Sequence, residues 1–101
     1  MTVSLFDDSN GTDEAPYLRW LSEHPGGLVV NLRRRPDPSY AVLHRATCWT
    51  ITRPTLRTEG GPFTSRAYIK ACATDEAALR ASIVARQGAG FSKRCAVCGP
   101  A

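Results

Sequence analysis

Apolar residues recur at helical spacing near the start of the chain and at alternate positions shortly after it. The stripe formed by Tyr17, Leu18 and Leu21 predicts a helix over residues 14–24. A Pro-Gly-Gly break follows, and the alternation of apolar and polar residues in LVVNLRR predicts a strand over residues 28–34. The chain therefore begins with a helix that leads into a half-buried strand.

The pattern continues with more strands. YAVLH predicts a second strand over residues 40–44 after a proline-rich turn, and residues 47–52 predict a third, short one. RAYIKAC, over residues 66–72, is the last predicted strand. Residues 53–65 contain two prolines and a Gly-Gly pair, so we expect a loop there.

A second helix is predicted after the last strand. Thr74 is expected to cap it, Leu79 and Ile83 form its buried side, and Gly88 ends it. These elements predict an α+β fold, in which a small antiparallel sheet of three to four strands is flanked by an N-terminal and a C-terminal helix.

The composition is typical of one small domain. The chain has 101 residues, of which 43% are hydrophobic and 22% charged, and this length leaves no room for a second core. Residues 1–12 are polar and are expected to form a flexible leader before a single domain over 13–101. No apolar run reaches the roughly 18 residues of a membrane span, and the opening MTVSLFDDSN is acidic where a secretory signal is basic. We expect a cytoplasmic protein that a staple would stabilise.

Four cysteines and a histidine offer a candidate staple. Disulfides are rare in the cytoplasm, so the cysteines indicate metal binding or buried thiols. Cys95-x2-Cys98 has the spacing of a zinc knuckle, and His44-x3-Cys48 supplies two further ligands for a tetrahedral Zn2+ site. Two alternatives stay open: Cys72 in place of His44, or no metal at all, with packed or redox-active thiols.

The order of these residues resembles a known module. LHRATCWTI, a strand, a helix and a closing RCAVCGP, over about residues 40–100, are similar to the metal-binding module of the bacterial alkylation-repair protein Ada and of its relatives appended to nucleases. The resemblance implies a zinc site at His44, Cys48, Cys95 and Cys98 and a role on DNA, including the sensing of alkylated or otherwise modified DNA. YLRWLSEHPGGLVVNLRRRPDPSYAVLHRA also resembles small domains of bacterial restriction systems.

The chain departs from the Ada pattern in two respects. The segment between Cys48 and Cys95 holds 46 residues, more than those compact modules use. His44 stands where the methyl-accepting Ada domain has only cysteines. Both departures argue against methyl transfer.

The charge of the chain is unevenly distributed. Residues 1–32 carry a net charge of −4 and residues 33–101 a net charge of +8, and 11 of the 13 basic residues are arginine. Arginine binds phosphate through its planar fork and stacks on bases, so this excess favours a polyanion such as double-stranded DNA. A solvated basic face, or the arginine enrichment of GC-rich genomes, is the alternative explanation. The expected nucleic-acid contacts are Arg33, Arg34, Arg35, Arg45, Trp49, Arg53, Arg57 and Arg66.

Two classes of function follow. The first is a zinc-stabilised DNA-binding module that recognises methylated or otherwise modified DNA in a restriction or repair setting. The second is a protein-interaction or regulatory domain with a purely structural zinc and an acidic protein partner. Four soft ligands leave no open position for a zinc-bound water, so we do not expect an enzyme. A zinc-thiolate methyl acceptor is the remaining catalytic alternative.

Overall fold

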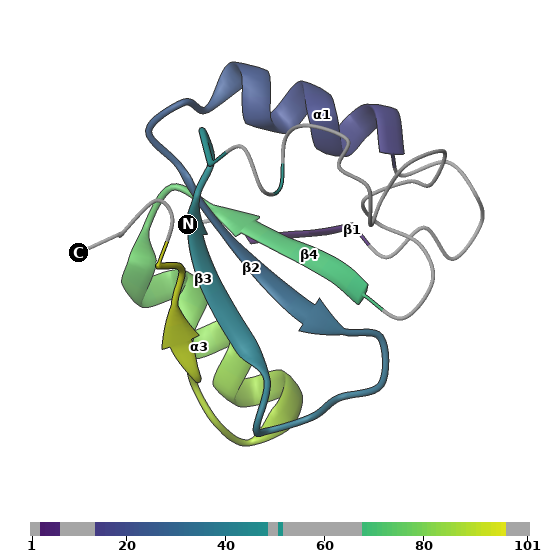
Figure 1. The fold of residues 1–101 in the computed structure, drawn as a ribbon, viewed down its shortest axis with the longest axis vertical. Helices are drawn as coiled ribbons and strands as arrows, with labels where there is room; N and C mark the ends of the chain where they lie inside the picture. The colour runs from purple at the N-terminus through teal and green to yellow at the C-terminus, as the bar shows by residue number, and fades with distance from the viewer. Residues whose placement is uncertain (1–2, 7–13, 49–50, 52–67, 97–101) are drawn as a thin grey trace.

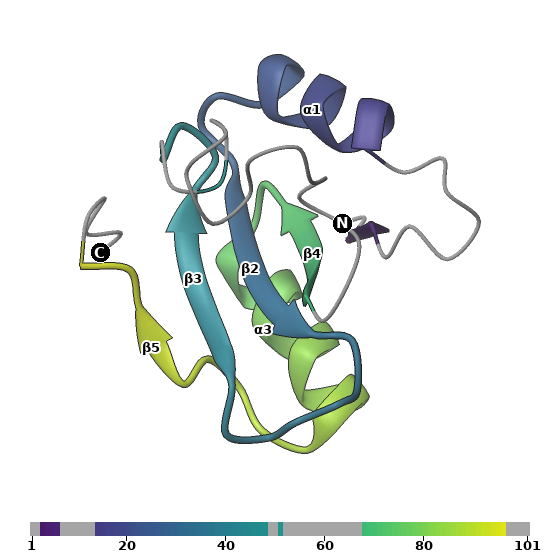
Figure 2. The same cartoon turned by 45° about the vertical axis from the view of Figure 1, so that its right-hand side comes forward.

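The computed structural model has an α+β fold, as the sequence predicts, and describes residues 3–6, 14–48, 51 and 68–96 (Figure 1). Five strands form one mixed sheet in the order β1-β4-β2-β3-β5, with α1 over one face and α3 behind the other (Figures 1 and 2). The elements are β1 (Ser4–Phe6), α1 (Glu14–Glu23), β2 (Leu28–Arg33), β3 (Ala41–Arg45), β4 (Tyr68–Ala73), α3 (Glu76–Gln87) and β5 (Lys93–Arg94).

β2 is the central strand of the sheet, and both of its faces are covered. It pairs antiparallel with β3 on one side and with β4 on the other, so that Val30 lies opposite Leu43 and Ala71. Successive side chains of a strand point to opposite faces. Val30 therefore packs on the α3 side and Val29 on the α1 side, as the alternation in the sequence predicts.

The two helices complete two separate cores. On the α1 side, the ring of Tyr17 is fully buried, meets Phe6 edge to face at 5.7 Å, and donates its hydroxyl to the Ile51 carbonyl at 2.8 Å. On the α3 side, Leu79 and Ile83 are buried, as predicted. Leu18 differs from the prediction, because it lies 40% exposed beside the buried stripe of α1.

The sheet has more strands than the predicted three to four, and it is not wholly antiparallel. Ser4–Phe6, within the predicted leader, form β1 and pair with β4, while Lys93–Arg94 form β5 and run parallel to β3. Strands of three and two residues are too short to show an alternating pattern, so their pairing depends on the neighbouring strand. Residues 46–48 form a turn and not the start of a strand, whereas the predicted loop over 53–65 lies outside the described residues.

The second helix begins one residue later than predicted. Its N-cap is Asp75, whose carboxylate accepts a hydrogen bond from the amide of Ala78 at 3.2 Å, and not Thr74. Gly88 ends the helix as expected: its φ of 81° is in the left-handed region that glycine adopts without strain, and its amide donates to the Val84 carbonyl.

Candidate functional site

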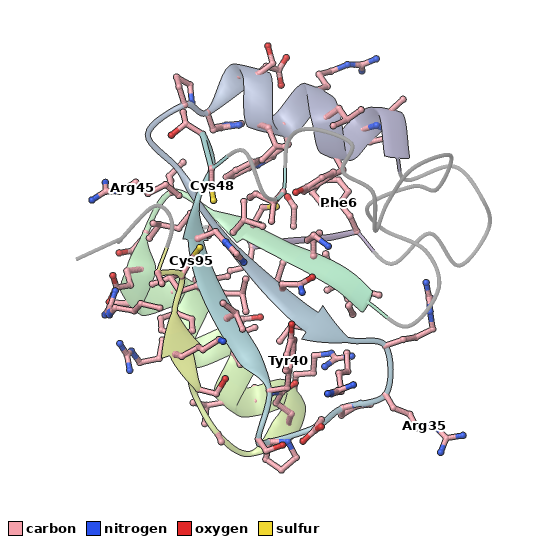
Figure 3. The ribbon with its side chains drawn as sticks, viewed as in Figure 1. Phe6, Arg35, Tyr40, Arg45, Cys48 and Cys95 are labelled. Atoms are coloured by element: carbon pink, nitrogen blue, oxygen red, sulfur yellow. The ribbon has the colours of Figure 1, made fainter. Side chains whose placement is uncertain are left out.

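Three buried side chains with metal-ligating atoms meet at the end of β3. The candidate ligand atoms of His44, Cys48 and Cys95 all lie within 4.8 Å of one another. The two sulfurs are 3.9 Å apart. Figure 3 shows Cys48 and Cys95 near the end of β3 that carries Arg45. Zinc–sulfur bonds of about 2.3 Å in a tetrahedral site place two sulfurs about 3.8 Å apart. The three residues therefore lie close enough to hold a metal ion.

Three different elements bring these donors together. His44 lies on β3, on the face that α1 covers, and a turn after β3 carries Cys48 back over it. The amide of Cys48 donates to the Arg45 carbonyl at 3.0 Å within this turn, and the amide of Ala46 donates to the Gly27 carbonyl at 3.0 Å. Cys95 follows β5, and its amide donates to the Leu43 carbonyl at 2.8 Å. Strand pairing therefore fixes two of the donors and a hydrogen-bonded turn fixes the third.

The surroundings of His44 favour the form of its side chain that binds metal. Burial lowers the pKa of His44 from 6.5 to about 4, and the positive charges of Lys70 and Lys93 add to the effect. The imidazole is therefore neutral at neutral pH, which is the form that coordinates metal. Cys48 and Cys95 are 3% and 7% exposed and belong to the apolar core on the α1 side, so the cluster is shielded from solvent.

Cys72 does not join this cluster. It is fully buried on β4, opposite Val29 of β2, and among the described residues the group of neighbouring metal donors contains only His44, Cys48 and Cys95. Burial raises the pKa of the Cys72 thiol to about 12, with the charge of Lys70 opposing the rise. A protonated, buried thiol of this kind behaves as a small apolar core residue.

A second candidate functional feature is the loop between β2 and β3, which carries consecutive arginines. Arg33 is 45% exposed, pairs with Asp37 at 3.1 Å, and stacks over the ring of Tyr40 at 4.8 Å. Asp37 also accepts hydrogen bonds from the amide and hydroxyl of Ser39, which hold the pKa of its carboxyl below the usual value. Arg35 is exposed and points away from the molecule (Figure 3). The loop is thus an internally bonded basic turn.

No protein-family model, curated protein or solved structure matches the chain.

The arginines expected to contact nucleic acid do not all lie together in the structure. Arg33, Arg34 and Arg35 lie at the end of β2 and in the loop after it, whereas Arg45 is exposed at the opposite end of β3 (Figure 3). Four residue steps at about 3.3 Å each put roughly 13 Å of strand between Ala41, next to the loop, and Arg45. The other predicted residues lie outside the described part of the chain: Trp49, Arg53, Arg57, Arg66 and Cys98.

Arg86 and Gln87 contact the basic loop, although no sequence pattern indicates this contact. Both lie in the last turn of α3, and both donate hydrogen bonds to carbonyls of residues 33–40. Contacts between positions about 50 residues apart leave no local signal in the sequence.

Neither α1 nor α3 combines the length and the apolar character that a membrane-crossing helix needs.

Proposed function

We propose that the protein is a small DNA-binding module whose fold is closed by one Zn2+ ion. The observation that carries the proposal is the buried meeting of His44, Cys48 and Cys95, three donors that come from two segments far apart in the chain. Few abundant cellular metals other than zinc bind well to a set of two thiolates and an imidazole. We propose Cys98 as the fourth ligand, because its spacing from Cys95 is that of a zinc knuckle.

The proposed role of the metal is structural. A site with four protein ligands has no open position for a substrate or an activated water. The ion would tie the segment after β5 to the turn after β3, in addition to the backbone hydrogen bond that joins Cys95 to Leu43 within β3. A chain of 101 residues gains much from such a tie, because it buries a smaller share of its surface than a larger domain does.

The proposed contact with DNA is made by the β2–β3 loop. Arg34 and Arg35 follow each other in a turn whose backbone accepts hydrogen bonds from Arg86 and Gln87, and Arg35 is exposed. Arginine side chains on an ordered turn suit phosphate contacts, which position a protein on the duplex without selecting a sequence. Selection of methylated or otherwise modified DNA, in a restriction or repair setting, is the more specific form of the proposal.

The metal is tested by elemental analysis of the purified protein. We expect one zinc per chain, a loss of zinc in Cys95→Ser, and full zinc content in the matched control Cys72→Ala, whose thiol lies outside the cluster. Zinc retained by Cys95→Ser, or lost by Cys72→Ala alone, would contradict the proposed ligand set.

DNA binding is tested by fluorescence anisotropy with plain duplex, methylated duplex and single-stranded DNA of one sequence. We expect salt-sensitive binding that Arg34→Ala/Arg35→Ala weakens about tenfold or more, since each lost phosphate contact reduces affinity and its salt dependence. The matched control is Arg19→Ala/Arg80→Ala, which removes the same charge from exposed positions of α1 and α3. Absence of binding to any of these DNAs at about 0.15 M ionic strength would overturn the proposal and favour an acidic protein partner.

A further inference from the structure

The C-terminal end of α3 is built into the β2–β3 loop through side-chain hydrogen bonds. The amide nitrogen of Gln87 donates to the carbonyls of Asp37 at 2.7 Å and of Tyr40 at 3.1 Å. One guanidinium nitrogen of Arg86 donates to the carbonyls of Arg33 at 3.2 Å and of Arg34 at 3.0 Å. Two adjacent helix residues thus hold both halves of the loop.

These contacts form one unit with a defined geometry. The other terminal nitrogen of Arg86 donates to the side-chain oxygen of Gln87 at 2.8 Å, which fixes the orientation of the Gln87 amide toward the loop. Gln87 is only 8% exposed, so its polar atoms would be costly to bury without these partners. Gly88 ends the helix immediately afterwards, which sets the position of both side chains relative to the loop.

We propose that Arg86 and Gln87 are positioning residues for the DNA interface: they hold the β2–β3 loop in the conformation that presents Arg34 and Arg35 to a phosphate backbone. This inference rests on the DNA-binding function proposed above. A loop that is ordered before binding loses less conformational freedom when it meets its partner, so the contacts from α3 raise affinity without touching DNA. Their hydrogen bonds to carbonyls direct Arg86 and Gln87 to the loop backbone and not to DNA, whereas Arg35 of the loop is exposed and points away from the molecule.

The test uses substitutions that keep the charge of the protein constant. Gln87→Met keeps the length of the side chain and removes both hydrogen bonds to the loop. Arg86→Lys keeps the charge but removes the fork whose two terminal nitrogens bond the loop carbonyls and Gln87 at the same time. We expect each to weaken binding to duplex DNA about fivefold to tenfold. Val84→Thr, an exposed position one turn earlier on α3, is the matched control and is expected to bind as the unmodified protein does.

Two further measurements separate positioning from loss of structure or of direct contacts. The slope of log affinity against log salt concentration is expected to stay unchanged in Gln87→Met, because the same phosphates are contacted, whereas Arg35→Ala reduces it by about one. Amide hydrogen exchange is expected to accelerate at Ser39 and Tyr40, whose amides donate to Asp37, in Gln87→Met while β2 and β4 keep their protection. Arg86→Lys provides a second test if Gln87→Met does not fold.

The outcomes distinguish the two proposals. Full affinity in both Gln87→Met and Arg86→Lys overturns the positioning role and leaves DNA binding standing. Weaker binding accompanied by loss of exchange protection throughout the sheet also overturns it, since the residues then act on global stability. If the unmodified protein binds no DNA, the proposed function fails first and the inference fails with it.

Discussion

Asp75 stabilises the first turn of α3 through a hydrogen bond to the amide of Ala78 at 3.2 Å. The first amides of a helix have no partner within the helix, so a side-chain acceptor at the N-cap lowers the free energy of the folded state. We expect Asp75→Ala to reduce the free energy of unfolding by about 1 kcal/mol, measured by urea denaturation. Thr74→Ala is the control, with an expected change in the free energy of unfolding within about 0.5 kcal/mol. A larger loss of stability in Thr74→Ala than in Asp75→Ala would identify Thr74 as the cap.

Sequence spacing predicted which side chains lie together where these residues are close in the chain. His44-x3-Cys48 crosses one turn, so the sequence already placed the imidazole and the thiol near each other. Cys95 meets them because β5 pairs with β3, and a two-residue strand of sequence Lys-Arg carries no apolar signal that predicts this. Gln87 could not be identified from the sequence, since a glutamine in the last turn of a helix is ordinarily a solvent-exposed residue.

At the level of elements, β5 is the shortest of the described strands. It contributes two residues to the sheet, and beyond it the Cys95 amide donates to Leu43. Its other end is anchored independently, because the hydroxyl of Ser92 accepts from the Ala41 amide at 2.8 Å and the Ser92 amide donates to the Ala41 carbonyl at 2.8 Å. The proposed metal therefore acts on the Cys95 end of this strand.

Removal of the metal is expected to loosen that end first. After chelation, we expect hydrogen exchange at the Cys95 amide to accelerate about tenfold or more, a smaller change at the Ser92 amide, and unchanged protection in β2 and β4. The paired strands keep their own backbone hydrogen bonds and the core beneath them, whereas the Cys95 end loses the ion that holds it. The measurement is exchange followed by mass spectrometry or NMR with and without a chelator.

Two results would contradict this prediction. Equal acceleration at all amides would mean that the ion stabilises the whole domain and not one strand. No change at Cys95 would mean that the backbone hydrogen bond to Leu43 suffices without metal. Cys72→Ala, which retains the three clustered donors, serves as the matched control and is expected to respond to chelation as the unmodified protein does.

The elements that the sequence predicted are those with a continuous apolar pattern. The side chains of β2, β3 and β4 alternate between the core and the other face of the sheet, and α3 buries Leu79 and Ile83 at helical spacing. The period of the apolar residues was therefore sufficient to predict these elements. β1 is different because only Phe6 of its three residues is buried and acidic residues follow it directly. A short edge strand is stabilised by the strand beside it, here β4, and that pairing is a property of the fold.

For the whole molecule, the arrangement of charge limits how DNA can lie on it. The molecule measures 32 × 27 × 25 Å, and the arginines of the β2–β3 loop lie at the opposite end of β3 from Arg45 and the metal-ligating cluster. On the α3 side, Arg80 and Arg94 are paired with Glu76, and these contacts lower the pKa of that carboxyl. Among the described residues, the loop is therefore the place where consecutive arginines gather.

This arrangement predicts that Arg45 and Arg35 differ in their effect on DNA binding. If the loop alone meets the duplex, two or three phosphates are contacted, and log affinity falls with log salt at a slope of about −2 to −3. Arg35→Ala then reduces the slope by about one, while Arg45→Ala changes affinity by less than about twofold, because screening over the length of β3 weakens its influence. Anisotropy titrations at several salt concentrations measure both effects. A steeper slope that Arg45→Ala also reduces would instead mean that the duplex runs along β3 from the loop to the metal-ligating cluster, so that both ends of the strand contact phosphates.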